Sequence, residues 1–347
     1  MPVDLDKVYG NDVIVRYKGG VTPERFTHRY ASERINPLTG DPIPFDRIQN
    51  LLTSARLDIE AWYKKETGRE KMDTLQLGDM LARVRERFWH DERFAQAFRL
   101  LGLDYETHHQ KANLPWWSAV IAGELEHKIV DDDHVHVVFG PAHSFEVQMM
   151  RAGLTTPVRP ASTDGLIVTS DGAPYAVIGV RGGHSYRNTY HLVAAGALDA
   201  PEGFKRGELS VYDVFREREI TPELGIGSAE IKSAQLRSRN IEHLLSNGGV
   251  TYLFDVITNL TKDELAERWR NNRSPDKAEH LALVPLYDFP FQDIHEFIER
   301  NYRGAVANKQ DRHDNERYLL HPAALDLAAH IDMHPSELRS LYREGTW

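Results

Sequence analysis

The stretch Arg218-Glu219-Ile220-Thr221-Pro222-Glu223-Leu224-Gly225-Ile226 sets two carboxylates four residues apart, behind an arginine and ahead of a glycine. On a helix, positions i and i+4 lie on the same face. We therefore expect Glu219 and Glu223 to point the same way, close enough to share a hard divalent cation. The glycine can then end the helix in a left-handed conformation that strains other residues.

The composition limits the classes of function. The chain has 347 residues, long enough for two domains or one large domain, and its 41% hydrophobic content can fill a sizeable core. The formal net charge of −10 argues against a protein that grips nucleic acid through a basic face. Without cysteine there is no disulfide, thiolate zinc site or cysteine nucleophile. With no visible secretory signal or apolar run of membrane length, we expect a cytoplasmic protein without a membrane segment.

The first part of the chain, residues 1–150, is predicted to be a helical region with a few strands. Between about residues 44 and 103, apolar residues recur at helical spacing with charges between them. A later strand carries His134 and His136 on one face, where they could bind a metal. Since no third ligand is evident, ordinary polar strand positions are the favoured interpretation.

Residues 306–347 are predicted to form a helical tail. Within it, residues 320–343 could fold as two helices around a tight turn, like a helix-turn-helix. Such motifs place cations and amides on base edges and phosphates, and here the recognition face has only Arg339 and Arg343 as cations. A plain helical hairpin packed on the body is therefore the favoured interpretation.

Residues 151–305 are predicted to form the central domain, and strands and turns dominate residues 157–290 within it. The patterns at 163–169 and 175–181 predict two strands joined by a hairpin turn, and 190–196 predicts a strand that runs into a glycine loop. The central helix is expected over Leu209 to Leu224. A strand, a helix and another strand follow it.

The central stretch and the order of elements around it resemble the Nudix hydrolase family. The family signature is Gly-x5-Glu-x7-Arg-Glu-U-x-Glu-Glu-x-Gly-U, in which U is a bulky aliphatic residue. In register with its second half are Arg218, Glu219, Ile220, Glu223, Gly225 and Ile226. The resemblance covers roughly residues 160 to 300.

The first half of the signature is stretched in this chain. Gly196 and Glu202 keep the expected spacing, but fifteen residues then precede Arg218 instead of seven. If Glu208 takes the role of the first glutamate, nine residues intervene. In both alignments the loop before the helix is longer than in the signature.

Pro222 occupies a glutamate position of the signature, so one carboxylate of the family's metal cluster is missing. Proline removes a helical N–H and disfavours the α conformation in the residue before it, here Thr221. We therefore expect a kink at this point, which leaves the direction of Glu223 open.

The resemblance implies an α/β (α+β) fold, a Nudix-type α/β/α sandwich with a mixed sheet over residues 151–305. The helical N-terminal region and the helical C-terminal tail flank it. The implied function is metal-dependent hydrolysis of a nucleoside diphosphate derivative, with Mg²⁺ or Mn²⁺ as the cofactor and a small-molecule nucleotide as the substrate. A homodimer is an open expectation.

The resemblance also implies the metal ligands. Glu219 and Glu223 would bind the metal directly or through waters. At about 100° per residue, Glu208 falls in the same sector of a continuous helix, which favours it over Glu202 as the third ligand.

The implied catalytic set contains the same two glutamates and two further residues. Arg218 would hold the glutamates in place, and Glu279, which opens a later strand, is the candidate for the carboxylate that the family often takes from this part of the fold. Arg181 ends a strand and would bind a substrate phosphate or carboxylate as a bidentate donor.

Two other functions stay open. A catalytically weakened Nudix fold could bind a nucleotide metabolite as a sensor, and it could be a transcriptional regulator if the tail is a helix-turn-helix. The third alternative is an interaction scaffold without a ligand.

Overall fold

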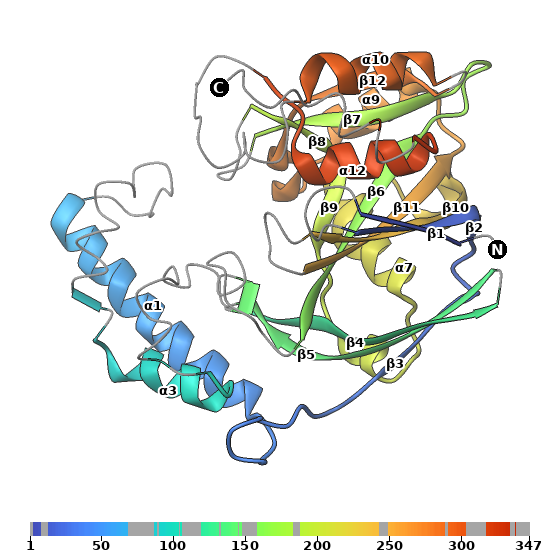
Figure 1. The fold of residues 1–347 in the computed structure, drawn as a ribbon. Coiled ribbons are helices and arrows are strands. Elements are labelled where there is room, and N and C mark those ends of the chain that lie inside the picture. Colours follow the sequence, from blue (N-terminus) through green and yellow to red (C-terminus); the bar gives the residue numbers. More distant parts are fainter. Residues whose placement is uncertain are drawn as a thin grey trace.

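The computed structural model describes most of the chain, and Figure 1 labels its helices and strands. The described residues are 3–7, 13–68, 87–88, 90–103, 105, 119–131, 133–144, 146–147, 158–182, 188–242, 249–288, 291–302, 317–333 and 337. None of the helices within these ranges combines the length and the apolar character that a membrane-spanning helix needs.

Two helices of the N-terminal region, α1 (Phe45–Thr67) and α3 (Glu92–Leu100), pack against each other at one side of the molecule (Figure 1). The apolar residues of α1 recur at spacings of three and four, which buries one face of this helix. That face contacts the aromatic rings of α3 in a small core of its own. Residues 69–86, where the helical pattern of the sequence continues, lie outside the described residues.

Within the described residues, twelve strands form one mixed sheet. They are β1 (Val3–Lys7), β2 (Val13–Val21), β3 (Phe26–Tyr30), β4 (Val120–Asp131), β5 (His134–His143), β6 (Arg159–Val168), β7 (Tyr175–Arg181), β8 (Tyr190–Leu192), β9 (Ala194–Ala197), β10 (Ile231–Glu242), β11 (Gly249–Thr258) and β12 (His280–Tyr287). The main path is β1-β2-β10-β11-β6-β4-β5-β3, with β7 and β9 paired to β6, and β8 and β12 paired to β7. The pairs β6–β11 and β3–β5 are parallel.

The predicted hairpin at the start of the central region is confirmed, since β6 and β7 pair antiparallel with Ile167 opposite Val177. Strands from the first 150 residues (β1 to β5) belong to the same sheet as the later strands. The sequence did not indicate β10. This strand is rich in polar residues, and one of them, Arg239, forms a buried ion pair with Glu124 of β4.

Helices cover both faces of the central strands (Figure 1). Along β11, Phe254 faces a core that includes Phe215 of α7 (Val211–Phe215). The neighbouring Leu253 faces a second core, which includes Ile298 of α10 (Gln292–Asn301) and Leu327 of α12 (His321–His330). This alternation between two helical layers confirms the expected α/β/α sandwich with a mixed sheet.

The described part of the C-terminal tail is the helix α12, whose side chains are almost all buried. It packs into the second core beside α10 rather than lying on the surface (Figure 1). The second helix of the predicted hairpin, with Arg339 and Arg343, lies outside the described residues.

Candidate active site

The helix with the acidic face is built from three segments: α7, the π-helical turn η1 (Arg216–Ile220) and α8 (Thr221–Leu224). Ser210 caps its start: the Ser210 Oγ accepts from the Asp213 N–H at 3.0 Å, and Asp213 accepts from the Ser210 N–H at 3.0 Å. The helix ends at Gly225, which has a φ of 73° and donates to the Thr221 carbonyl. The glycine stop predicted from the sequence is therefore confirmed.

The helix continues through Pro222, and the turn before the proline is the part that departs from a regular α-helix. Thr221 has helical backbone angles (φ −66°, ψ −47°), and its N–H bonds to the carbonyl of Arg216, five residues back. This wider π-turn restarts the hydrogen-bond register just ahead of the proline. Pro222 then lies in the first turn of α8, where a missing N–H costs little.

Glu219 in η1 and Glu223 in α8 point the same way, and their carboxyl groups hydrogen-bond to each other. Burial and, next to it, the adjacent carboxyl of Glu223 together raise the pKa of Glu219 to about 9. Glu223 is only 4% exposed, and this burial raises its pKa well above the usual range. At neutral pH the pair therefore retains a proton unless a cation compensates its charge.

A glycine in a neighbouring strand makes room for this pair. Gly196 lies in β9, and a Cβ atom at this position would overlap the carboxyl group of Glu219. The backbone of β9 thus passes directly beside the acidic face. This contact requires a residue without a side chain at position 196, where only a glycine loop was predicted.

His280, at the start of β12, holds the other glutamate. Its Nε2 lies 2.7 Å from the Glu223 Oε2 and 2.8 Å from the Val193 carbonyl oxygen. Because a carbonyl oxygen only accepts, Nε2 carries the hydrogen and donates. Burial lowers the pKa of His280 to about 4, so the ring is neutral. The ring also packs on Gly179 of β7, where a Cβ would overlap it.

His280 was not predicted as a site residue, whereas its neighbour Glu279 was. Glu279 ends the 3₁₀ turn η3 (Pro275–Glu279), and its side chain is about half exposed at the pocket opening. Arg181, at the end of β7, places its Nη2 3.6 Å from the Glu279 Oε2. The Arg181 Nε is buried and has no hydrogen-bond partner within the described part of the chain.

Of the remaining two predicted residues, Arg218 lines the same pocket as the glutamate pair and Glu208 does not. Arg218 is largely exposed, and its Nε lies 3.4 Å from the Asp199 carboxylate. Asp199 also raises the pKa of Glu219, so Arg218 pairs with a carboxylate that itself acts on Glu219. Glu208 is exposed and binds Arg206 with both carboxylate oxygens, each at 2.8 Å.

The structure does not bring Glu208 to the acidic face, because the helix does not extend back to it. The expectation of a continuous helix through this residue is wrong: the cap at Ser210 starts the helix at Val211. Glu202 also lies elsewhere, in the short helix α6 (Glu202–Lys205), where it pairs with Lys205 at 2.7 Å.

Glu219, Glu223 and His280 lie on the wall of a pocket of about 710 Å³, which we call the acidic pocket. Its carboxylates are Asp199, Glu219, Glu223, Asp276 and Glu279, and its cations are Arg181 and Arg218. The described residues contain no group of three or more His, Asp or Glu side chains arranged around one metal position. The adjacent pair still fits Mg²⁺, which usually takes one or two carboxylates and completes its shell with water and substrate phosphate.

No family model and no curated protein sequence matches the chain. Solved structures do show similarity. A Deinococcus radiodurans protein is 13% identical, with 53% of this chain and 84% of that chain covered and a TM-score of 0.31. A MutT/Nudix family protein from Enterococcus faecalis is 14% identical (37% and 43% covered, TM-score 0.21). The Nudix domain of Shewanella oneidensis NrtR, solved with ADP ribose, is 14% identical (30% and 62% covered, TM-score 0.21). The chain thus spans less than two thirds of the Enterococcus and Shewanella chains.

Proposed function

We propose that the acidic pocket hydrolyses a diphosphate bond in a nucleoside diphosphate derivative, with Mg²⁺ or Mn²⁺ as the cofactor. The observation that carries this proposal is the contact between the half-buried Glu219 and the buried Glu223, whose carboxyl groups hydrogen-bond to each other. Two carboxyl groups in contact and away from water cost free energy unless a positive charge compensates them. Strongly shifted acids in a pocket are typical of functional sites.

Each side chain has a proposed task. Glu219 and Glu223 would hold the metal, which when bound polarises water and phosphoryl oxygens. His280 donates to one oxygen of Glu223 and so fixes the direction of that carboxylate. Arg181 would bind a phosphate oxygen of the substrate. Glu279, beside Arg181 at the opening, would take the proton from the water that attacks phosphorus, while the leaving phosphate departs with the broken bond's electrons.

The test is turnover by the full chain with Mg²⁺ or Mn²⁺, using chromatography to follow products from nucleotide sugars, ADP-ribose and nucleoside triphosphates. We expect Glu219→Gln to lower kcat/KM by about 100-fold or more, since it removes a charge that acts on the reacting phosphate. Glu217→Gln is the matched control, because Glu217 lies in the same π-turn but is exposed and pairs with Arg216. No product from any substrate, together with no Mn²⁺ binding, would refute the proposal.

A second candidate is a sensor that binds the nucleotide without hydrolysing it. The observation in its favour is Pro222, which stands where the signature has a carboxylate. The same pocket would bind the ligand, again through Arg181. Saturable binding of ADP-ribose that depends on Arg181, with no turnover in any of the assays above, would select this candidate over the hydrolase.

A further inference from the structure

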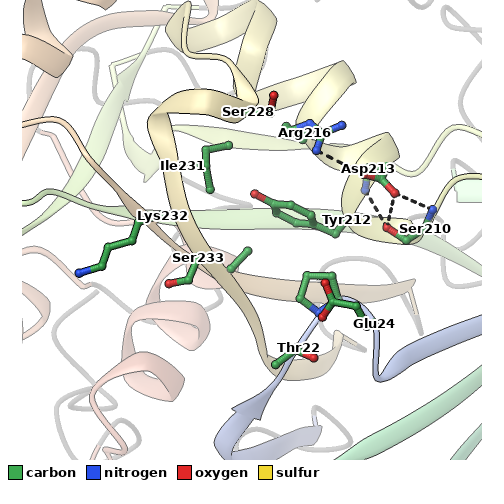
Figure 2. Close-up of a pocket in the computed structure, with 12 residues that line it drawn as sticks. Thr22, Glu24, Ser210, Tyr212, Asp213, Arg216, Ser228, Ile231, Lys232 and Ser233 are labelled. Carbon is green, nitrogen blue, oxygen red and sulfur yellow. Dashed lines mark hydrogen bonds and ion pairs between the residues drawn. The ribbon is translucent and has the colours of Figure 1, made fainter.

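The helix that carries the glutamate pair is capped at both ends, but by different means. Its start is capped locally, because Asp213 accepts from the Ser210 N–H at 3.0 Å and from the Ser210 hydroxyl at 2.7 Å (Figure 2). In its last turn, α8, the Pro222 carbonyl lies too close to the helix end to receive a hydrogen bond from a later helical residue. This carbonyl belongs to the peptide unit next to Glu223, so its partner bears on the acidic face.

The partner of this carbonyl comes from another helix. Asn272 directly follows α9 (Lys262–Asn271), and its Nδ2 donates to the Pro222 carbonyl oxygen at 2.6 Å. The Asn272 side chain lies directly against the end of α8, because a Cβ at Gly225 would come within 3.1 Å of the Asn272 Cβ. Gly225 therefore ends α8 in a left-handed conformation and also leaves the room that Asn272 fills.

The other end of the Asn272 amide holds the chain that follows. Its Oδ1 accepts from the Ser274 N–H at 3.0 Å. The Ser274 hydroxyl accepts in turn from the Asp276 N–H at 3.2 Å, which caps η3. The turn η3 and the first residue of β12 then place Asp276, Glu279 and His280 at the acidic pocket. One amide group thus joins the end of α8 to the beginning of the segment that carries these three side chains.

The two contacts together require a side chain that donates and accepts at once. The Pro222 carbonyl can only accept a hydrogen bond, and the Ser274 N–H can only donate one. A carboxylate at position 272 could serve Ser274 but not Pro222, and an apolar side chain could serve neither. The same two partners fix which end of the amide faces which segment, so the Asn272 side chain has one orientation.

We propose that Asn272 is a positioning residue of the acidic pocket. By joining the Pro222 carbonyl to the turn that starts η3, it sets where Glu223 lies relative to Glu279 and His280. Asn272 is not one of the residues that line the pocket, so it acts on the reaction only through the segments that it holds. The inference rests on the proposed hydrolase function, because it assigns Asn272 a part in the same site.

The experiment compares Asn272→Ala with the wild type as full chains, using Mn²⁺ and the substrate that the wild type turns over. We expect kcat to fall by about 10- to 100-fold, because a displacement of roughly 1 Å between Glu223 and Glu279 is costly for turnover. KM should change by less than about threefold, since Arg181, the proposed phosphate ligand, lies on β7, outside the two joined segments.

A second variant separates position from charge. Asn272→Asp keeps the acceptor for Ser274 but sets an oxygen against the Pro222 carbonyl, so kcat should fall at least as far as in Asn272→Ala. The added negative charge alone would strengthen Mn²⁺ binding. Weaker Mn²⁺ binding by Asn272→Asp, measured by calorimetry, is therefore the result expected from a displaced glutamate.

Thr261→Ala is the matched control, because it removes the cap at the other end of α9. Thr261 accepts from the Glu264 N–H at 3.3 Å and does not line the acidic pocket. This variant should lower the unfolding temperature by a few degrees, as Asn272→Ala does, and keep kcat within about twofold of the wild type.

Hydrogen exchange of the metal-free protein keeps this inference separate from the hydrolase proposal. We expect Asn272→Ala to speed amide exchange in both α8 and η3, and Thr261→Ala to speed it at the start of α9. A wild type without turnover would refute the hydrolase and leave the exchange test in force. The role of Asn272 is overturned if exchange in α8 and η3 does not change, or if Thr261→Ala lowers kcat as far as Asn272→Ala.

Discussion

At the scale of single residues, the candidate active site depends on glycines as much as on acids. Gly196 leaves the space that the Glu219 carboxyl fills, and Gly179 leaves the space for the His280 ring. Neither contact can be predicted from sequence spacing, because each joins strands and helices that are far apart along the chain. The two acids themselves were identified from their spacing alone, since i and i+4 share a helix face in any packing.

Gly196→Ala tests whether catalysis requires the Glu219 carboxyl to keep its position. The added methyl group overlaps the Glu219 carboxyl and must displace it, so we expect kcat/KM for the substrate that the wild type turns over to fall by about 100-fold. Mn²⁺ affinity should fall as well. Gly172→Ala is the matched control, because a Cβ at Gly172 meets no atom within 4 Å. Equal activity of both variants would show that Glu219 has no fixed position in catalysis.

At the scale of elements, α12 is held to the sheet by a buried histidine between two aspartates. The His330 Nδ1 lies 3.0 Å from Asp255 and its Nε2 lies 2.5 Å from Asp288. Burial alone would lower the pKa of His330, but the two carboxylates outweigh it and raise the pKa to about 9. The charged histidine therefore stabilises the fold at neutral pH.

The sign of the pH dependence follows from this raised pKa. The stabilisation is fully present below the unfolded pKa, near 6.5, and is lost as the pH rises through about 9. We expect His330→Gln to lower the free energy of unfolding by about 3 kcal/mol at pH 6 and by clearly less at pH 10. Urea unfolding at the two pH values measures this. His295→Gln, which alters a partly exposed histidine on α10, should change little, and an equal loss at both pH values would contradict the ion-pair explanation.

Two elements, the turn before Pro222 and the strand β10, differ from what the local sequence pattern predicts. The turn before Pro222 is a π-turn, and Thr221 keeps helical backbone angles although a proline follows it. The strand β10 was not predicted, since its polar residues hide the usual alternation. Their partners come from other strands, as with Arg239, and are visible only in the folded chain.

At the scale of the whole molecule, β4 is joined to the central strands by a buried polar network. The Arg239 guanidinium of β10 and the Tyr252 hydroxyl of β11 both donate to Glu124 of β4. Burial alone would raise the pKa of Glu124, but the bond with Arg239 keeps that pKa below its usual value. The network thus connects a strand from the first 150 residues to strands that carry the site's supporting core.

Removing one partner of this network should be costly, and removing both should not. We expect Arg239→Met to lower the free energy of unfolding by about 3–5 kcal/mol, because it leaves a buried carboxylate unpaired. The double variant Arg239→Met/Glu124→Leu should recover most of that loss. Chemical unfolding of the wild type, both single variants and the double variant gives the coupling energy. Additive losses would show that the two charges act independently.

The sequence by itself determined the helix with its acidic face, the glycine that ends it and the α/β order of elements. These features depend on the spacing of residues close together in the chain, which local backbone geometry converts directly into structure. Only the tertiary structure decided that His280 and Gly196 adjoin the glutamates, that Glu208 does not, and that Asn272 joins α8 to η3. Those relations depend on how strands and helices that are far apart in the sequence pack together. The resulting burial then shifts the pKa values of the glutamates and histidines, which the adjacent residues in the sequence do not reveal.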